Sequence, residues 1–488
     1  MLGRGWLKGA VLSLFLSSWA FAHANFDVPF SKWLKRQQHQ SYLRIRKNIT
    51  SCGAAMAAQS SHYQKHWVRD SALISLALTR YYEWMGPFAS QTATVVFARP
   101  ERLQSRRERI WTQLETKVRF STLIQSVGHP DPEIGIGAAL YSPAGEPIEE
   151  EWGQPQNDGP ALRASAHLKL ISAHATEETI LSETVTEEDL YALAKRDAEY
   201  VASNWSKPSW DLWEEIKGKH FYTLMAQRKA LVDVIRRGLQ RGDKESVEQW
   251  SAQVSLIEAE LRLFWDADKG YLVQTRDFVA DHAREYKKSN LDVATVLAVL
   301  HTHDPSDPFF GVLDPQILAT VVALENTFTP LYPINGRPGP EETVSEGVRA
   351  VELGPGIGRY VEDHWNGFSR GETAHPWFLA TAGFAEYYFL AAATLHSHPE
   401  RLEEIKETEF FKRLGCAPNV ESAVQALLRK GDSFLQRVRL HGTEKGELAE
   451  QFDRDSGYQT GPVDLTWSHA AFLTASIVRY ELEALVQN

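Results

Sequence analysis

The sequence of 488 residues predicts an all-α protein, a six-fold double barrel of helices of the (α/α)6 toroid class. About twelve segments place apolar residues at helical spacing, whereas convincing alternating strand patterns are scarce. Every second helix is rich in small and apolar residues, and most of the long connections come directly before one of these helices in the sequence. These observations together predict an inner ring and an outer ring of helices.

The predicted helices follow one another along nearly the whole chain. Asp158-Gly159-Pro160 supports the start of the fourth helix because proline suits a first turn, and Thr186–Asp189 resembles a capping sequence for the fifth. In chain order the helices are predicted at 31–50, 69–84, 101–125, 158–174, 187–204, 219–240, 245–265, 290–301, 314–328, 376–396, 420–441 and 465–486.

The even-numbered helices are the apolar ones, as in Ser71–Leu78 of the second and Phe378–Ala385 of the tenth. Helices that are apolar on most sides are usually buried, so we place the even helices in the inner ring. In an up-and-down array, all links from an odd to an even helix meet at one end. Four of these links are distinctive and should form a site there; they are 126–157, 205–218, 329–375 and 442–464.

Composition narrows the function. The formal charge of −11 and the lack of Lys/Arg blocks argue against nucleic acid as a partner. The 15 tryptophans suit a carbohydrate enzyme, because aromatic faces stack on sugar rings, although alone they are a weak indication.

The N-terminus has the features of a signal peptide. Arg4 and Lys8 precede the apolar run Ala10–Phe21, and Ala22-His23-Ala24 has the small-x-small form of a cleavage site. We expect residues 1–24 to be the signal peptide and 25–488 to be one exported catalytic domain, periplasmic or secreted; an uncleaved anchor helix is the alternative. No later segment is expected to be long and apolar enough to span a membrane, and the mature chain is expected to be a monomer.

The two cysteines are not expected to form a disulfide. Cys52 lies in the link between the first and second helices, and Cys416 lies between the tenth and eleventh, at the opposite end of the array. A helix of about fifteen residues is roughly 22 Å long, whereas disulfide-bonded Cα atoms lie within about 7 Å.

Two acidic segments more than two hundred residues apart carry the strongest functional signal. One is Trp210–Glu215, and the other is Leu448–Phe452, followed by Asp464–Ser468. Each puts a carboxylate beside large aromatic side chains, and two opposed carboxylates are the minimal machinery for hydrolysing a glycosidic bond.

Five segments, in order, resemble the signatures of the glucoamylase family (glycoside hydrolase family 15). One alone would be a weak match, but five in order along the chain are specific, and the family's fold is a six-fold double barrel of helices. The segments are His66–Leu73, Trp152–Arg163, Asp211–Glu215, Gly358–Asp363 leading to Pro376–Leu379, and Glu450–Phe452 with Asp464–Ser468.

The resemblance implies that Glu214 is the general acid and Glu450 the general base. Aromatic neighbours such as Trp213 should raise the pKa of the acid, and the base should be ionised. Otherwise Glu214 and Glu215 would be a solvated helix start, and Glu450 a polar loop residue. The residues that the resemblance assigns to substrate binding are Tyr63, Trp67, Arg69, Asp70, Trp152, Asp211, Trp213, Glu215, Arg359, Asp363 and Trp377.

Simpler roles remain open for several of these residues. Arg69 and Asp70 could form an internal salt bridge, and the tryptophans could be core. Trp365 occupies a position where better-known fungal relatives have tyrosine, which leaves the outer subsites and the preferred chain length open.

The expected activity is that of an exo-acting glucan 1,4-α-glucosidase that releases β-D-glucose from the non-reducing ends of α-1,4-glucans and maltooligosaccharides with inversion. No metal or cofactor is required, because the two carboxylates make the proton transfers. The alternatives are hydrolysis of isomaltose, dextran or trehalose linkages on the same scaffold, or a glucan-binding protein without catalysis; both catalytic positions are Glu, which disfavours the latter.

Overall fold

The computed structural model describes residues 25–86, 100–149, 153–175, 185–280, 285–344, 347–371 and 373–487. The predicted signal peptide and Trp152 lie outside these ranges, so nothing further is said of their structure.

Twelve long helices occupy the described part of the chain, and each begins and ends within a few residues of its predicted bounds, which confirms the helix prediction. The link 397–419 also holds two short helices that were not predicted, α14 (Leu402–Ile405) and α15 (Glu409–Arg413). The long helices are α2 (Phe30–Lys47), α3 (Val68–Trp84), α5 (Pro100–Val127), α6 (Asp158–Ala175), α7 (Glu187–Asn204), α8 (Phe221–Arg241), α9 (Lys244–Arg262), α11 (Ala294–His301), α12 (Pro315–Leu331), α13 (Phe378–Ser397), α16 (Val420–His441) and α17 (Thr466–Gln487).

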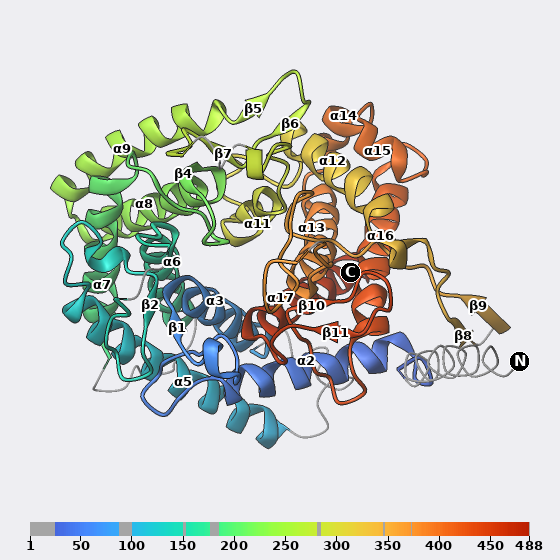
Figure 1. Cartoon of the computed structure of the whole chain (residues 1–488), viewed down its shortest axis with the longest axis horizontal. Coiled ribbons are helices and arrows are strands. Elements are labelled where there is room, and N and C mark those ends of the chain that lie inside the picture. Colours follow the sequence, from blue (N-terminus) through green and yellow to red (C-terminus); the bar gives the residue numbers. More distant parts are fainter. Residues whose placement is uncertain are drawn as a thin grey trace, which may run out of the picture.

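Six of these long helices, namely every second one in chain order, form a closed inner ring; they are α3, α6, α8, α11, α13 and α17. Helix α3 contacts α6, α6 contacts α8, α8 contacts α11, α11 contacts α13, α13 contacts α17, and α17 returns to α3. The remaining long helices pack on the outside of this ring, as α7 does on α6, α9 on α8 and α16 on α13. Figure 1 shows the helices arranged around a central axis. The predicted (α/α)6 double barrel is therefore confirmed.

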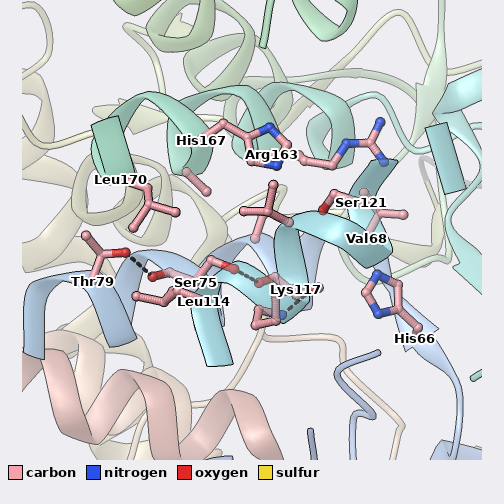
Figure 2. Close-up of a pocket in the computed structure, with 14 residues that line it drawn as sticks. His66, Val68, Ser75, Thr79, Leu114, Lys117, Ser121, Arg163, His167 and Leu170 are labelled. Atoms are coloured by element: carbon pink, nitrogen blue, oxygen red, sulfur yellow. Dashed lines mark hydrogen bonds between the residues drawn. The ribbon is translucent and has the colours of Figure 1, made fainter. Parts of the chain in front are cut away.

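A small cavity lies within this packing, between α3, α5 and α6 (Figure 2). It has a volume of about 20 Å³. Its walls include Lys117, Arg163 and His167, so the helix interface is polar at this point.

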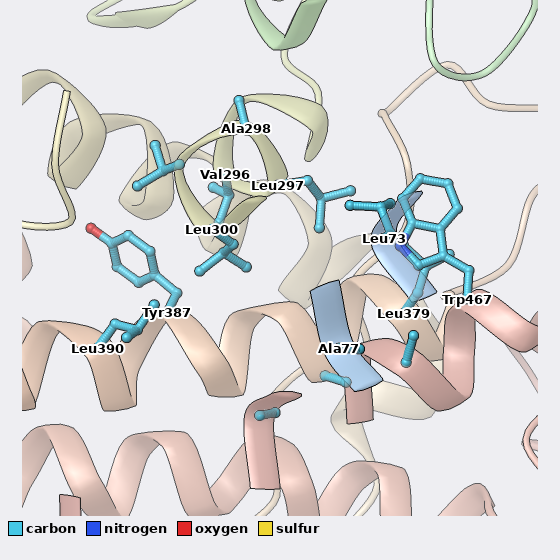
Figure 3. Packing of buried hydrophobic residues seen from close by; sticks show 14 of the residues in the cluster. Leu73, Ala77, Val296, Leu297, Ala298, Leu300, Leu379, Tyr387, Leu390 and Trp467 are labelled. Atoms are coloured by element: carbon cyan, nitrogen blue, oxygen red, sulfur yellow. The ribbon is translucent and has the colours of Figure 1, made fainter. Parts of the chain in front are cut away.

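Helix α13 corrects one expectation from the sequence. It is long and apolar enough to cross a membrane by length and composition, although no segment after the N-terminus was expected to be. The reason is its inner position: nearly all of its residues are buried in the protein. Figure 3 shows Leu379 and Leu390 of α13 among side chains such as Leu297 of α11 and Leu73 of α3. Truncating a buried leucine of this kind to alanine typically costs about 2–5 kcal/mol.

The strands are short and lie in the connections between helices. Antiparallel pairing ties the loops together: β1 pairs with β2, β10 with β11, β5 with β6, β8 with β9, and β4 lies between β3 and β7. The strands are β1 (His66–Trp67), β2 (Leu140–Tyr141), β3 (Ser209–Trp210), β4 (Lys217–His220), β5 (Trp265–Asp266), β6 (Tyr271–Leu272), β7 (Thr275–Arg276), β8 (Glu341–Val344), β9 (Gly347–Ala350), β10 (Gln451–Phe452) and β11 (Gln459–Thr460).

Both cysteines are free, as expected from the helix order. The exposed Cys52 thiol donates a hydrogen bond to the Pro143 carbonyl at 3.2 Å. Cys416 is half-buried in the short-helix link beyond α15.

Candidate active site

The first part of the site is built where strand β1 runs into helix α3. The Val68 N–H donates to the Ala139 carbonyl at 3.0 Å, which fixes the start of the helix. The Trp67 indole N–H donates to Glu214 Oε1 at 2.6 Å. One turn of chain therefore presents both an indole donor and, two residues on, the guanidinium of Arg69.

Arg69 is buried among acceptors. Its Nη1 donates to Gln156 Oε1 at 2.7 Å and lies 3.3 Å from Asp158 Oδ2. Its Nη2 lies 3.5 Å from Glu214 Oε1, and its Nε lies 3.4 Å from Asp70 Oδ1. Burial raises the pKa of Asp70 to about 6, against the opposing charge of Arg69. The Arg69–Asp70 salt bridge, which was the alternative to substrate binding, is present, and Arg69 also reaches the proposed acid.

Glu214 lies at the turn of the 211–216 loop. Its backbone φ is 66°, in the left-handed region that non-glycine residues rarely adopt, and its N–H donates to the Asp211 carbonyl at 2.9 Å. A backbone of this kind costs roughly 1–3 kcal/mol and persists only where its surroundings hold it.

Asp211 supplies that support. Its Oδ1 accepts from the N–H groups of Glu215 and Ile216 at 2.8 and 3.0 Å, and its Oδ2 accepts from Lys287 Nζ at 3.0 Å. The residue is fully buried. The Asp211 carboxylate therefore holds the loop that carries Glu214; its predicted contact with substrate stays a prediction.

Polar donors surround the Glu214 carboxyl. Besides Trp67 and Arg69, the Gln156 side-chain amide donates to Oε1 at 3.0 Å. The aromatic neighbour Trp213 turns its indole N–H away, to Asp292 Oδ1 at 3.0 Å. The aromatic residue that contacts the carboxyl of the proposed acid is therefore Trp67 rather than Trp213, the residue beside it in the sequence.

The neighbouring Glu215 belongs to a separate cluster of charges. Arg359 donates through Nη2 to Glu215 Oε1 at 3.0 Å and to Asp363 Oδ1 at 2.6 Å. The Tyr360 hydroxyl donates to Glu215 Oε2 at 2.5 Å. Charged groups of this kind make the stronger hydrogen bonds to sugar hydroxyls.

Glu450 is the second carboxylate, and only 3% of it is exposed. Oε1 accepts from the Tyr63 hydroxyl at 3.2 Å, and Oε2 accepts from the Trp365 indole N–H at 2.9 Å. Burial raises the pKa of Glu450 to about 7, although the bonds from Trp365 and Tyr63 and the charge of Arg359 act in the opposite direction. The expected full ionisation of the base is therefore opposed by burial at neutral pH.

Close packing of the backbone fixes Glu450 as well. Its N–H donates to the Pro462 carbonyl at 3.1 Å, and its carbonyl accepts from the Phe378 N–H at 3.2 Å. Gly461 has a φ of +78°, and a Cβ there would lie 3.1 Å from Glu450 Oε2. Glycine at 461 therefore leaves space beside the carboxyl group.

Stacked aromatic rings join the two sides. Tyr63, which holds Glu450, stacks on Trp67, which holds Glu214, with ring centroids 6.1 Å apart. On the other wall, Trp213 lies 5.6 Å from Trp377, and the Arg359 guanidinium lies 5.3 and 5.2 Å from their centroids. These ring contacts join five of the predicted site residues in two groups, Tyr63 with Trp67, and Trp213 and Trp377 with Arg359; Trp152 lies outside the described residues.

Two of the carboxylate donors, Gln156 and Trp365, were not predicted as site residues. Both lie within or beside the signature segments, Gln156 in the second and Trp365 just after the fourth. Each has a side-chain N–H donor and lies in a loop that was predicted to be functional. The sequence does not reveal which oxygen such a donor contacts.

Known proteins resemble this chain along most of its length. The family described as glycosyl hydrolases family 15 matches residues 30–477. "Glucoamylase 1" of Rhizopus oryzae is 30% identical over 467 residues, covering 92% of this chain and 71% of the relative. A relative from Saccharomyces cerevisiae named "Glucoamylase, intracellular sporulation-specific" is 28% identical, covering 92% and 84%. The solved glucoamylase of Saccharomycopsis fibuligera superposes with a TM-score of 0.76 at 26% identity, covering 94% and 97%.

Proposed function

This chain belongs to glycosyl hydrolases family 15, and from that premise we propose how its residues perform the reaction of a glucan 1,4-α-glucosidase. The substrate is an α-1,4-glucan or maltooligosaccharide, bound by its non-reducing end. Water replaces the rest of the chain at the anomeric carbon, and the released sugar is β-D-glucose.

Glu214 is the general acid, which protonates the glycosidic oxygen as the bond to the leaving sugar breaks. Trp67, Gln156 and Arg69 converge on its Oε1. These contacts orient the carboxyl group, and they stabilise the carboxylate that remains after the proton has left.

Glu450 is the general base, which takes a proton from the attacking water. Tyr63 and Trp365 hold one oxygen each, so the carboxylate can turn little and keeps a fixed direction toward the water. An inverting pair needs space for that water, and the carboxyl groups of such pairs lie about 6.5–9.5 Å apart.

The terminal glucose would lie between the two groups of charged residues. Arg69 and Asp70 form one group, and Arg359 and Asp363 form the other. The observation that carries the mechanism is the Tyr63–Trp67 stack, because it joins the residue that holds Glu450 to the residue that holds Glu214.

The product anomer tests the mechanism. Maltose hydrolysis followed by NMR from the first turnovers should show β-glucose before mutarotation. Early α-glucose would overturn the inverting assignment. Parallel assays on isomaltose and trehalose would reveal whether another linkage is preferred to the α-1,4 bond.

We also propose that the chain is exported after cleavage near Ala24, and that it acts as a monomer without membrane insertion. The charged and apolar segments before residue 24 support export. One relative is named "Glucoamylase, intracellular sporulation-specific", so membership of the family does not by itself imply export. N-terminal sequencing of protein from the periplasm or medium tests the cleavage, and retention of residues 1–24 in the active protein would contradict it.

A further inference from the structure

The cavity between α3, α5 and α6 lies directly behind the β1–α3 segment that carries Trp67, Arg69 and Asp70 (Figure 2). His66, Val68 and Ser71 of that segment form part of its wall. Neither Glu214 nor Glu450 lines it, so the cavity is separate from the reacting groups.

Lys117 of α5 is the most unusual residue in this wall. It is 3% exposed, and its ammonium donates to Ser71 Oγ at 2.6 Å. Among the described residues, no Asp or Glu lies within ion-pair distance of its Nζ. A buried charge without a counter-charge is costly, and burial lowers the pKa of Lys117 to about 7.

The opposite wall offers further donors. Arg163 of α6 uses Nε and Nη2 for Asp197, at 2.9 and 2.6 Å, whereas its buried Nη1 has no hydrogen-bond partner among the described atoms. His167 Nδ1 is also buried without such a partner. The Asp197 carboxylate balances Arg163, so protonated Lys117 leaves the cluster with one excess positive charge.

We propose that this cavity binds one monatomic anion, a chloride or bromide, held between the Lys117 ammonium and the unpartnered nitrogens of Arg163 and His167. A single negative charge balances the excess positive charge of the cluster. The volume of about 20 Å³ accommodates one small particle and excludes sulfate, phosphate and carboxylates. A water molecule would also fit, but it brings no charge.

The titration of Lys117 determines the pH dependence of binding. The groups around its ammonium are His66 from β1 and Arg163 and His167 from α6. Burial lowers the pKa of His66 well below its ordinary value and lowers that of His167 to about 3. Both rings are therefore neutral at the pH values at which Lys117 titrates. The anion binds protonated Lys117, so its affinity rises as the pH falls through the pKa of Lys117 and is lost at alkaline pH.

The first test is thermal unfolding of the full chain in sodium chloride, sodium bromide or sodium gluconate at equal ionic strength. A halide at ten times its Kd should raise Tm by about 1–2 °C over gluconate. The rise should be larger at about pH 6 than at about pH 9. Lys117→Met should abolish the halide-specific part. Lys169→Met is the control, because Lys169 lies on the α6 surface and pairs with Glu83 at 2.8 Å, and it should keep the full effect.

The second test needs no variant and stands even if Lys117→Met fails to fold. Crystals grown or soaked in bromide should give an anomalous peak between Lys117, Arg163 and His167. Equal Tm values in halide and gluconate for the unmodified chain, with no bromide peak in the cavity, would overturn the assignment and identify a water site beside a neutral lysine.

Discussion

Glu214 and Glu450 are the same residue type in opposite surroundings. Glu214 sits on a left-handed turn, its side chain is 17% exposed, and two N–H donors and a guanidinium converge on one of its oxygens. Glu450 is 3% exposed, and each of its oxygens accepts one neutral donor. Burial favours the protonated form of a carboxyl, and it raises the pKa of Glu450 to about 7.

This contrast shows that the aromatic residues around a carboxylate in sequence do not define its environment in space. Trp213 adjoins Glu214 in the chain but donates to Asp292. Trp365 is far from Glu450 in the chain but donates directly to it. The balance between burial and donors thus differs on the two sides, and substitutions on each side should give different signatures.

The largest expected effect is at Glu214. Glu214→Gln keeps the shape and the bonds to Oε1 but cannot give a proton to the leaving oxygen. General acid catalysis is worth about 10²–10⁴-fold, so kcat on maltose should fall by that factor with KM little changed.

Steady-state kinetics on two substrates check this prediction. Glucosyl fluoride needs less protonation of its leaving group, and it should lose much less activity in Glu214→Gln than maltose does. A variant that keeps near-normal turnover of maltose would remove Glu214 from the mechanism.

The second effect concerns stability and arises on the Glu450 side. Its folded-state pKa of about 7 lies above the ordinary value of 4.5. Its contribution to stability is therefore fully present below about pH 4.5 and is lost as the pH rises to about 7. Glutamine at this position does not ionise, so Glu450→Gln removes this loss. The change in the free energy of unfolding that the substitution causes should be more favourable at about pH 8 than at about pH 4, by on the order of 1–3 kcal/mol.

Urea unfolding at the two pH values measures that difference. Glu214→Gln is the matched control, and it should show no such gain because Arg69 loses a carboxylate neighbour in that variant. An equal gain in both variants would mean that the two sides do not differ as described.

The smallest expected effect is at Trp365. Trp365→Phe removes the N–H that lowers the pKa of Glu450, so that pKa should rise. The base must be ionised, so the acidic limb of the kcat/KM profile should move to higher pH by up to about one unit. At a fixed pH below the limb, kcat/KM should therefore fall by up to roughly tenfold.

Trp205→Phe is the control for the loss of an indole donor. The Trp205 N–H donates to Gln253 at 2.7 Å, and neither residue contacts a proposed catalytic carboxylate. Its pH profile should be unchanged. An unshifted limb in Trp365→Phe would show that this bond does not tune the base.

The sequence predicted the scaffold better than the bonds within the site. Helical periodicity is a local signal, so all twelve long helices were found and their ring order followed from apolar composition. The sequence does not reveal that the Asp211 carboxylate accepts from the N–H groups of Glu215 and Ile216. The role of Trp365 depends on a contact between residues 85 positions apart, which no local pattern encodes.

The contacts of α17 and the segment before it with residues near the N-terminus have a consequence for biosynthesis. Thr466, at the start of the last helix, donates to the Met56 carbonyl at 2.7 Å, and Arg44 bonds Asp464 at 2.6 Å. These two hydrogen bonds join residues that lie far apart in the sequence. Closing so long a loop costs conformational entropy, so we expect these contacts to form late in folding. Helix α17 must leave the ribosome before the ring of inner helices can close on α3. Until then the Glu450 loop lacks its final support, and a truncated nascent chain has no functional site.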